Sequence, residues 1–375
     1  MSKIIYADHA ATTMLLPKAR EAMLPWLSEE YANPSTLYSL ARNPRKAIAD
    51  ARAVIAEVID AAPDEIFFTS CGTESDNWAL IGTALHFPNQ KKRIVTSSIE
   101  HHAVLRTCKF LEKLGYEVIY LPVDHFGLIR EVDLKDAIND NTILVSIMYA
   151  NNEIGTIEPI WEYSRIAHER DVLFHTDAVQ IMGHDYVKTH TVGVDMLSAS
   201  AHKFNGPKGV GFLYIKKGVP IEPLLHGGKQ ENGMRSGTEN VASIVGMAVA
   251  LQEHMKSMDA DRLYLEELRN QLISGLYSEK LDFIVNGADK HIPGSVSLSF
   301  KNVEGEMLLH RLDLMGIVVA TGSACNSKET VLSHVIKAIE VPSEYANGTI
   351  RITLGTDNNV EQVNEIVAAL RKILK

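Results

Sequence analysis

The sequence predicts an α/β protein with two domains. The larger should contain a seven-stranded, mainly parallel sheet flanked by helices, and the smaller should be an α+β unit. Two observations support this. Short apolar runs alternate with amphipathic segments between residues 66 and 215, a pattern typical of a parallel sheet covered on both faces. The chain also has 375 residues, which is enough to bury a large core in each of two domains.

The amino-terminal part of the chain predicts a short strand followed by helices. Residues 4–7 form an apolar run that leads into a loop of small and polar residues at 8–13. Residues 17–27 predict a helix because proline is favoured in the first helical turn. Between residues 43 and 59 apolar side chains recur on one face, which predicts an amphipathic helix.

Seven apolar runs then predict the strands of the large sheet. They are residues 66–69, 93–96, 117–123, 142–148, 172–176, 196–199 and 211–215. Helix-like segments lie between most of these runs, for example at 74–85, 102–114 and 160–170.

The remainder of the chain predicts the smaller domain. A helix of small residues at 241–251 precedes a longer amphipathic helix at 259–277, which we expect to bridge the two domains. Strands are predicted at 295–300, 317–320 and 349–354, with a helix near 304–315 and a last helix over 363–373. We assign the large domain to residues 13–256, and the smaller domain to residues 1–12 and 257–375.

Composition argues against several classes of partner. The formal net charge of −10 and the lack of a basic run argue against binding to nucleic acid or to an anionic membrane surface. The three cysteines are too few for a disulfide framework and indicate a reducing compartment. No signal or transit pattern opens the chain, and the longest uncharged apolar run is too short to cross a bilayer. We therefore expect a cytoplasmic protein. The fifteen histidines show no metal-ligand spacing, so no metal is expected.

Lys203 is the first candidate catalytic residue. It follows a predicted strand that ends in small residues, next to Ala201, which leaves room for a bound ring. Partial desolvation at such a sheet edge lowers the pKa of an amine and makes it nucleophilic towards a carbonyl. The alternative is a solvated lysine at a strand end.

Asp177 and Gln180 follow another predicted strand upstream. A buried carboxylate suits the pyridinium nitrogen of pyridoxal 5′-phosphate, and a lysine suits its aldehyde. Asp177 and Lys203 together therefore suggest an enzyme that uses this coenzyme.

A phosphate site is predicted where a strand meets a helix at residues 70–75. Gly72 and Thr73 would allow backbone N–H groups at the helix start to approach a phosphate, and Ser200 and His202 could reach the same group. The alternative is an ordinary helix start capped by Thr73.

His101 and Asn152 complete this set of candidates. A histidine after the strand at 93–96 could stack on a cofactor ring and carry protons, although a structural role is the alternative. Asn151 and Asn152 follow the strand at 142–148, where an amide could hold a substrate or could cap a turn.

Cys325 and Arg351 are candidates outside the large domain. Cys325 lies in a small, polar, glycine-flanked segment, where a cysteine could act as a nucleophile on a mobile arm or could be a chance surface thiol. Arg351 lies within a predicted strand that would fix its guanidinium for a carboxylate, or for a structural ion pair. Cys71, at a helix start, is better explained as a space-filling residue than as a reactive one.

Taken together, these segments resemble the cysteine desulfurases of the NifS/IscS group, within the aminotransferase class V family of fold-type I pyridoxal phosphate enzymes. The resemblance runs from Tyr6 to Gly355. The matching segments are residues 6–13, 33–35, 72–77, 100–101, 151–155, 175–180, 200–203, 235–238, 322–325 and 350–351.

The resemblance implies a homodimer that converts L-cysteine to L-alanine and passes sulfur to an acceptor protein, either an iron–sulfur scaffold or a tRNA-thiolation enzyme. In this family's pattern Lys203 would carry the coenzyme, Asp177 would pair with the ring nitrogen and Gln180 with the ring hydroxyl. His101 would stack on the ring and shuttle protons. The phosphate would be held by Thr73, Ser200 and His202, with Thr238 contributed by the other subunit. Asn152 and Arg351 would hold the substrate carboxylate, and Cys325 would accept the sulfur as a persulfide.

Two positions depart from the family's pattern, and other functions compete with this one. His9 stands where asparagine is common, so a substrate contact there is in doubt, and Cys71 stands where glycine is usual. A selenocysteine lyase or an aminotransferase of the same fold is the first alternative. A thiol hydrolase using Cys325 and a non-catalytic sulfur carrier are the others.

Overall fold

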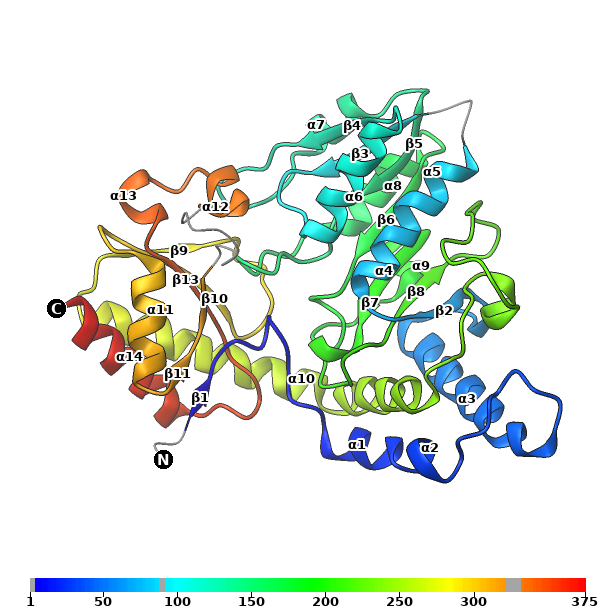
Figure 1. Ribbon diagram of the computed structural model, residues 1–375. Helices are drawn as coiled ribbons and strands as arrows, with labels where there is room; N and C mark the ends of the chain where they lie inside the picture. The colour runs from blue at the N-terminus through cyan, green and yellow to red at the C-terminus, as the bar shows by residue number, and fades with distance from the viewer. Residues whose placement is uncertain (1–3, 88–91, 322–331) are drawn as a thin grey trace.

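A seven-stranded sheet forms the centre of the larger part of the molecule (Figure 1). The computed structural model describes residues 4–87, 92–321 and 332–375. The strand order is β2-β8-β7-β6-β5-β3-β4, and β8 runs in the direction opposite to that of the other six strands. The strands are β2 (Ile66–Thr69), β3 (Arg93–Ser97), β4 (Glu117–Leu121), β5 (Thr142–Ser146), β6 (Leu173–Asp177), β7 (Met196–Ser200) and β8 (Gly211–Ile215). The predicted seven-stranded, mainly parallel sheet is confirmed.

Helices cover both faces of this sheet because its strands are apolar on both sides. Along β8, Phe212 and Tyr214 join one core and Leu213 joins the other, as the two-residue period of a strand requires. The first face is covered by α3 (Arg42–Ile59), α7 (Glu131–Ala137), α8 (Ile160–His168) and part of α10 (Val241–Ser278). The second is covered by a continuous helical stretch and by α6 (His102–Lys113). That stretch comprises α4 (Gly72–Asn77), a π-helical turn (Trp78–Gly82) and α5 (Thr83–His86).

The long helix α10 joins the two parts of the molecule (Figure 1). The prediction of two helices, at 241–251 and 259–277, was wrong. The intervening residues 252–258 contain no proline or glycine, so nothing in them interrupts the backbone hydrogen bonds. The helix packs on the large sheet through Ile244 and Met247, and on the smaller core through Leu268 and Leu272.

The smaller part is an antiparallel sheet of order β12-β13-β10-β9 with helices against it. Its strands are β9 (Phe283–Asn286), β10 (Ser295–Phe300), β12 (Ala320–Thr321) and β13 (Thr349–Thr353), and β1 (Ile5–Tyr6) pairs nearby with β11 (Ile317–Val318). Its helices are α11 (Gly305–Leu314), α12 (His334–Ala338), α13 (Ser343–Ala346) and α14 (Val360–Leu374). The α+β character is as expected, and the boundaries drawn at residues 12 and 256 stay a prediction.

Some smaller elements differ from the sequence-based expectation. Pro25 divides the predicted helix 17–27 into α1 (Pro17–Met23) and α2 (Pro25–Ser28). The predicted strand 317–320 is divided into β11 and β12, and β9, α7, α12 and α13 were not predicted. A further helix, α9 (Thr189–Val192), is a single turn. Among the described residues no helix is both long enough and apolar enough to cross a membrane.

We expect Leu272→Ala to lower the free energy of unfolding by about 2–5 kcal/mol, because it leaves a cavity where α10 packs on the smaller core. Leu263 lies on the same helix and is 73% exposed, so Leu263→Ala should change that free energy by less than about 0.5 kcal/mol. Urea denaturation of both variants measures the difference. Equal losses would mean that α10 does not pack as described.

Candidate active site

A cavity of about 340 Å³ lies where β6 and β7 end. Of the described residues that the family resemblance assigns to the coenzyme, the substrate or catalysis, it brings together all except Thr238. Its lining comprises Gly72, Thr73, His101, Asn152, Asp177, Gln180, Ser200, His202, Lys203 and Arg351, with Ala10, Ala11, Cys71, Asp76, Met148 and Val179. Carboxyl ends of parallel strands are the usual place for a ligand site in such a sheet.

Lys203 extends from the turn after β7 into this cavity. Its Nζ donates to the carbonyl oxygens of Ala10 and Ala11, at 2.6 and 2.9 Å, and Gln180 Nε2 donates to the same Ala10 oxygen at 3.1 Å. Burial lowers the pKa of Lys203 to about 8, and the positive charge of Arg351 adds to this effect. The amine therefore loses its proton much more easily than an ordinary lysine, as a nucleophile for a carbonyl requires.

Asp177 is the last residue of β6 and is 5% exposed. Its Oδ1 accepts a hydrogen bond from the backbone N–H of Val179 at 2.9 Å. Burial raises its pKa, and His101 and Lys203 oppose that rise by favouring the charged carboxylate. Asp177 is thus a buried carboxyl group whose charged form is favoured by cationic neighbours, as a cationic ring atom in the cavity would be.

A second layer of buried polar groups lies behind Asp177. His175 is fully buried between the hydroxyls of Ser146 and Ser198, each 2.9 Å from a ring nitrogen, and burial lowers its pKa to about 3. Asp76 is 1% exposed, and its Oδ1 lies 3.8 Å from His175 Nε2. Burial and then the charge of Asp177 hold the pKa of Asp76 well above its usual range. Burial therefore favours the neutral forms of His175 and Asp76, whereas His101 and Lys203 favour the charged form of Asp177.

His101 precedes α6 and faces the cavity. Its Nδ1 accepts from the N–H of Ala103 at 3.1 Å, so the neutral ring carries its proton on Nε2. Loss of hydration lowers the pKa of His101, and the charge of Asp177 opposes this. The adjacent Glu100 is fully buried, with Oε1 accepting from the N–H of Met148 at 2.8 Å, and burial raises its pKa to about 8. Glu100 is thus protonated at neutral pH.

At the predicted phosphate site, the described residues leave the Ser200 hydroxyl without a hydrogen-bond partner and the start of α4 without a side-chain cap. Helix α4 begins at Gly72 and no side chain caps it, so the alternative that Thr73 caps this helix is wrong. A Cβ at Gly72 would lie 2.6 Å from Val179 Cγ2, so only glycine fits there without a shift. Ser200 Oγ is buried and has no hydrogen-bond partner among the described residues. Burial lowers the pKa of His202 to about 4, which leaves this ring neutral and able to donate one hydrogen bond.

Arg351 reaches the cavity from β13 and is 11% exposed. Its Nη1 donates to the backbone oxygen of Asn152 at 2.8 Å, and its Nη2 donates to Asp8 Oδ1 at 2.7 Å. Its Nε is buried and without a partner in the described part of the chain. Asn151 is a turn residue whose Oδ1 accepts from the N–H of Glu153 at 2.8 Å, so of the two amides only Asn152 lines the cavity.

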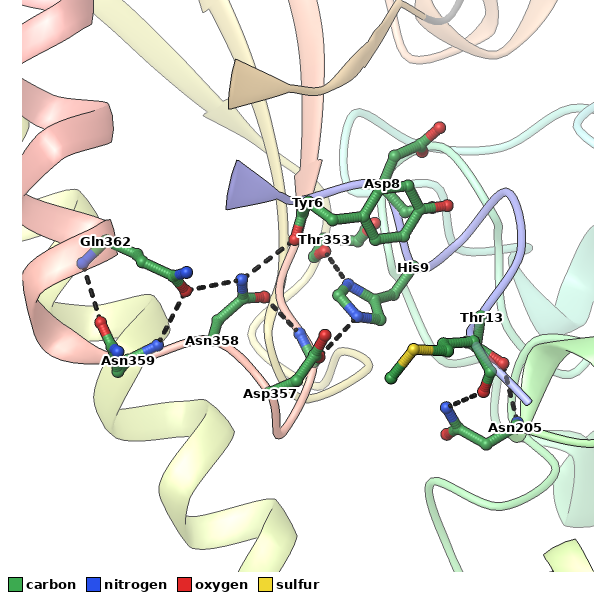
Figure 2. A network of polar contacts seen from close by, with 12 residues as sticks. Tyr6, Asp8, His9, Thr13, Asn205, Thr353, Asp357, Asn358, Asn359 and Gln362 are labelled. Atoms are coloured by element: carbon green, nitrogen blue, oxygen red, sulfur yellow. Dashed lines mark hydrogen bonds and ion pairs between the residues drawn. The ribbon is translucent and has the colours of Figure 1, made fainter. Parts of the chain in front are cut away.

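Two other residues singled out in the sequence, Thr238 and His9, are absent from the cavity lining. Thr238 is exposed and is not part of the cavity lining. Cys325 lies outside the described residues. His9 is not part of the lining of this cavity. Its ring contacts the Thr353 backbone oxygen at 2.9 Å and Asp357 Oδ1 at 2.8 Å (Figure 2). His9 therefore fastens the 8–13 loop to the segment that follows β13.

Four buried or half-buried groups were missed by sequence reasoning: Asp8, Asp76, Glu100 and His175. All four lie within segments that match the family's pattern: residues 6–13, 72–77, 100–101 and 175–180. Their position in these segments is the sequence signal that could have identified them. Their partners, however, come from distant segments of the chain, so their roles depend on the tertiary structure.

A family model and named relatives match this chain over all or nearly all of its length. The aminotransferase class-V family model matches residues 5–366. A protein of Dictyoglomus turgidum named cysteine desulfurase IscS is 51% identical, over 100% of this chain and 95% of its own. A cysteine desulfurase IscS of Methanosarcina thermophila is 46% identical, over 100% and 93%.

Solved structures show the same likeness. A NifS-like protein superposes with a TM-score of 0.94 at 39% identity, covering 99% of each chain. A structure titled SspA in complex with cysteine superposes with a TM-score of 0.84 at 36% identity, covering 94% of this chain and 99% of its own.

The lowered pKa of Lys203 leads to a pH prediction for the coenzyme-free protein. Only the neutral amine attacks an aldehyde, so reductive methylation of Lys203 should accelerate as pH rises through about 8 and then level off. A solvated lysine would continue to accelerate to about pH 10. Mass spectrometry of the peptide that contains Lys203, with Lys203→Arg as the blank, measures the profile. A rate still rising at pH 10 would contradict the buried amine.

Proposed function

Since the chain belongs to the aminotransferase class V family and is a cysteine desulfurase, we propose that its cavity binds pyridoxal 5′-phosphate on Lys203. The observation that carries the proposal is the placing of Lys203, Asp177 and Ser200 around one cavity. An amine of low pKa and a buried carboxylate match the aldehyde and the ring nitrogen. The Ser200 hydroxyl, which has no partner within the described residues, lies beside a helix start without a side-chain cap and matches the phosphate. The members of this family depend on the same coenzyme.

The remaining cavity residues fit the rest of the coenzyme. We assign Gln180 to the ring hydroxyl, and His101, whose Nδ1 is already engaged by Ala103, to covering the ring and moving protons through Nε2. Thr73 and His202 join Ser200 at the phosphate, where Gly72 permits close approach of the backbone. We assign Thr238, exposed in a single chain, to the phosphate site of a partner subunit in a homodimer.

The substrate is L-cysteine, and we propose that Arg351 and Asn152 hold its carboxylate. Arg351 is fixed by two hydrogen bonds, so its guanidinium is already oriented. When bound, the coenzyme acts as an electron sink that weakens bonds at the α and β carbons of the substrate. Lys203 and His101 supply and remove protons beside these carbons.

Cys325 is the proposed sulfur acceptor. Its thiolate attacks the substrate sulfur, an S–S bond forms as the C–S bond breaks, and the β carbon takes a proton. One L-cysteine and one thiol thereby give one L-alanine and one persulfide, with no external oxidant or reductant. We propose that the persulfide then passes to an acceptor protein, either an iron–sulfur scaffold or a tRNA-thiolation enzyme. The relatives named above are desulfurases, which favours this reaction over transamination.

Cys325→Ser should reduce alanine formation from L-cysteine to background while leaving the coenzyme absorbance unchanged, because only the attacking thiol is lost. The matched control is Cys108→Ala, which removes a thiol buried in the apolar core and should retain activity. Alanine release and a persulfide-specific label measure the two results. Unchanged alanine formation in Cys325→Ser would refute the role of this cysteine.

Asp177→Asn should lower kcat by about 10²–10⁴-fold, since the ring nitrogen loses its charged partner. The variant should also retain less coenzyme after dialysis, which absorbance measures independently of activity. Wild-type coenzyme retention together with wild-type kcat would show that Asp177 does not face the ring nitrogen.

A further inference from the structure

The carboxylate of Asp8 has so far been described only as one of the two hydrogen-bond partners that orient Arg351. Asp8 follows β1 in the 8–13 loop, and its side chain is 15% exposed. Figure 2 shows the His9 ring turned toward Asp357, away from the Asp8 carboxylate. Asp8 Oδ1 instead accepts from Arg351 Nη2 at 2.7 Å.

This ion pair lies beside the position proposed for the substrate carboxylate. Arg351 is 11% exposed and Asp8 is 15% exposed, so solvent screens the two charges only weakly. Arg351 Nη1 is also engaged, by the oxygen of Asn152, whereas Arg351 Nε is buried without a partner in the described part of the chain. An incoming carboxylate can use Nε, but a two-pronged grip must also share an Nη group that is already bonded.

We infer that Asp8 tunes the affinity of the site for carboxylates: its own carboxylate competes with the substrate carboxylate for Arg351. The inference rests on the proposed role of Arg351. Two negative groups on one guanidinium repel each other, so the affinity for L-cysteine is lower than an unpaired Arg351 would give.

The competition has a consequence for turnover. The product, L-alanine, carries the same carboxylate as L-cysteine, so a tight grip on the substrate would also retain the product. Because Asp8 weakens both interactions equally, it raises KM and speeds product release. Asp8 also holds Arg351 in place while the cavity is empty.

The test compares two ligands of the coenzyme-loaded enzyme by calorimetry: L-alanine and L-alaninamide, which lacks the carboxylate. Asp8→Asn keeps the size and the acceptor oxygen but removes the charge. We expect its dissociation constant for L-alanine to fall by about tenfold, while that for L-alaninamide changes by less than about twofold. A purely structural effect would move both constants together.

Three further variants complete the design. Asp8→Ser is a second neutral replacement and should act in the same direction. Asp357→Asn removes a carboxylate that pairs with His9 and lies outside the cavity lining, so it should change neither constant. Arg351→Gln should abolish the preference for L-alanine over L-alaninamide.

The outcomes separate the inference from the proposed function. If Arg351→Gln leaves the preference for L-alanine intact, the proposed role of Arg351 fails. If Arg351→Gln removes it but the neutral Asp8 variants bind L-alanine no more tightly than wild type, only the inference about Asp8 fails. Parallel changes for the two ligands in Asp8→Asn would also overturn it.

Discussion

The site depends on the contact between Lys203 and the 8–13 loop. Two backbone carbonyls of this loop, at Ala10 and Ala11, accept the lysine's hydrogen bonds and hold its amine at the cavity. The loop is itself tied to β13 through Thr353, whose Oγ1 accepts from the N–H of Ala10 at 2.9 Å. β13 carries Arg351 in turn. One segment therefore sets the relative position of Lys203, the proposed nucleophile on the large sheet, and Arg351, the proposed carboxylate-binding residue on the smaller one.

Charge in the cavity is arranged by burial. Buried ionisable groups are costly when charged, so burial favours the neutral forms of the groups around Asp177. It raises the pKa of Asp76, raises that of Glu100 to about 8 and lowers that of His175 to about 3. The negative charge on Asp177 faces Lys203 and His101, which favour it. Desolvation favours the neutral forms of Asp76 and His175, and it also lowers the pKa of Lys203. The same physical effect therefore acts on the buried groups behind Asp177 and on the amine.

Arg351 shows how one ion pair can serve both structure and function. The sequence left two explanations open, a carboxylate grip or a structural ion pair. The structure shows the ion pair with Asp8 and also places Arg351 at the cavity. The two are compatible, because a guanidinium has five donors and the pair occupies one of them. The inferred competition follows from this shared use.

The sequence by itself determined the seven strands, the class of fold and ten of the sixteen residues that line the cavity. Apolar alternation specifies strands locally, and residues that follow parallel strands must converge at one sheet edge. Only the tertiary structure decided that α10 is continuous. It also decided that Asn151 holds a turn whereas Asn152 lines the cavity. Finally, it placed Asp76 in the cavity lining and Asp8 against Arg351. Each of these depends on partners far away in the chain, such as the 343 residues that separate Asp8 from Arg351. Burial and ion pairing arise between such segments, and local sequence patterns carry no information about them.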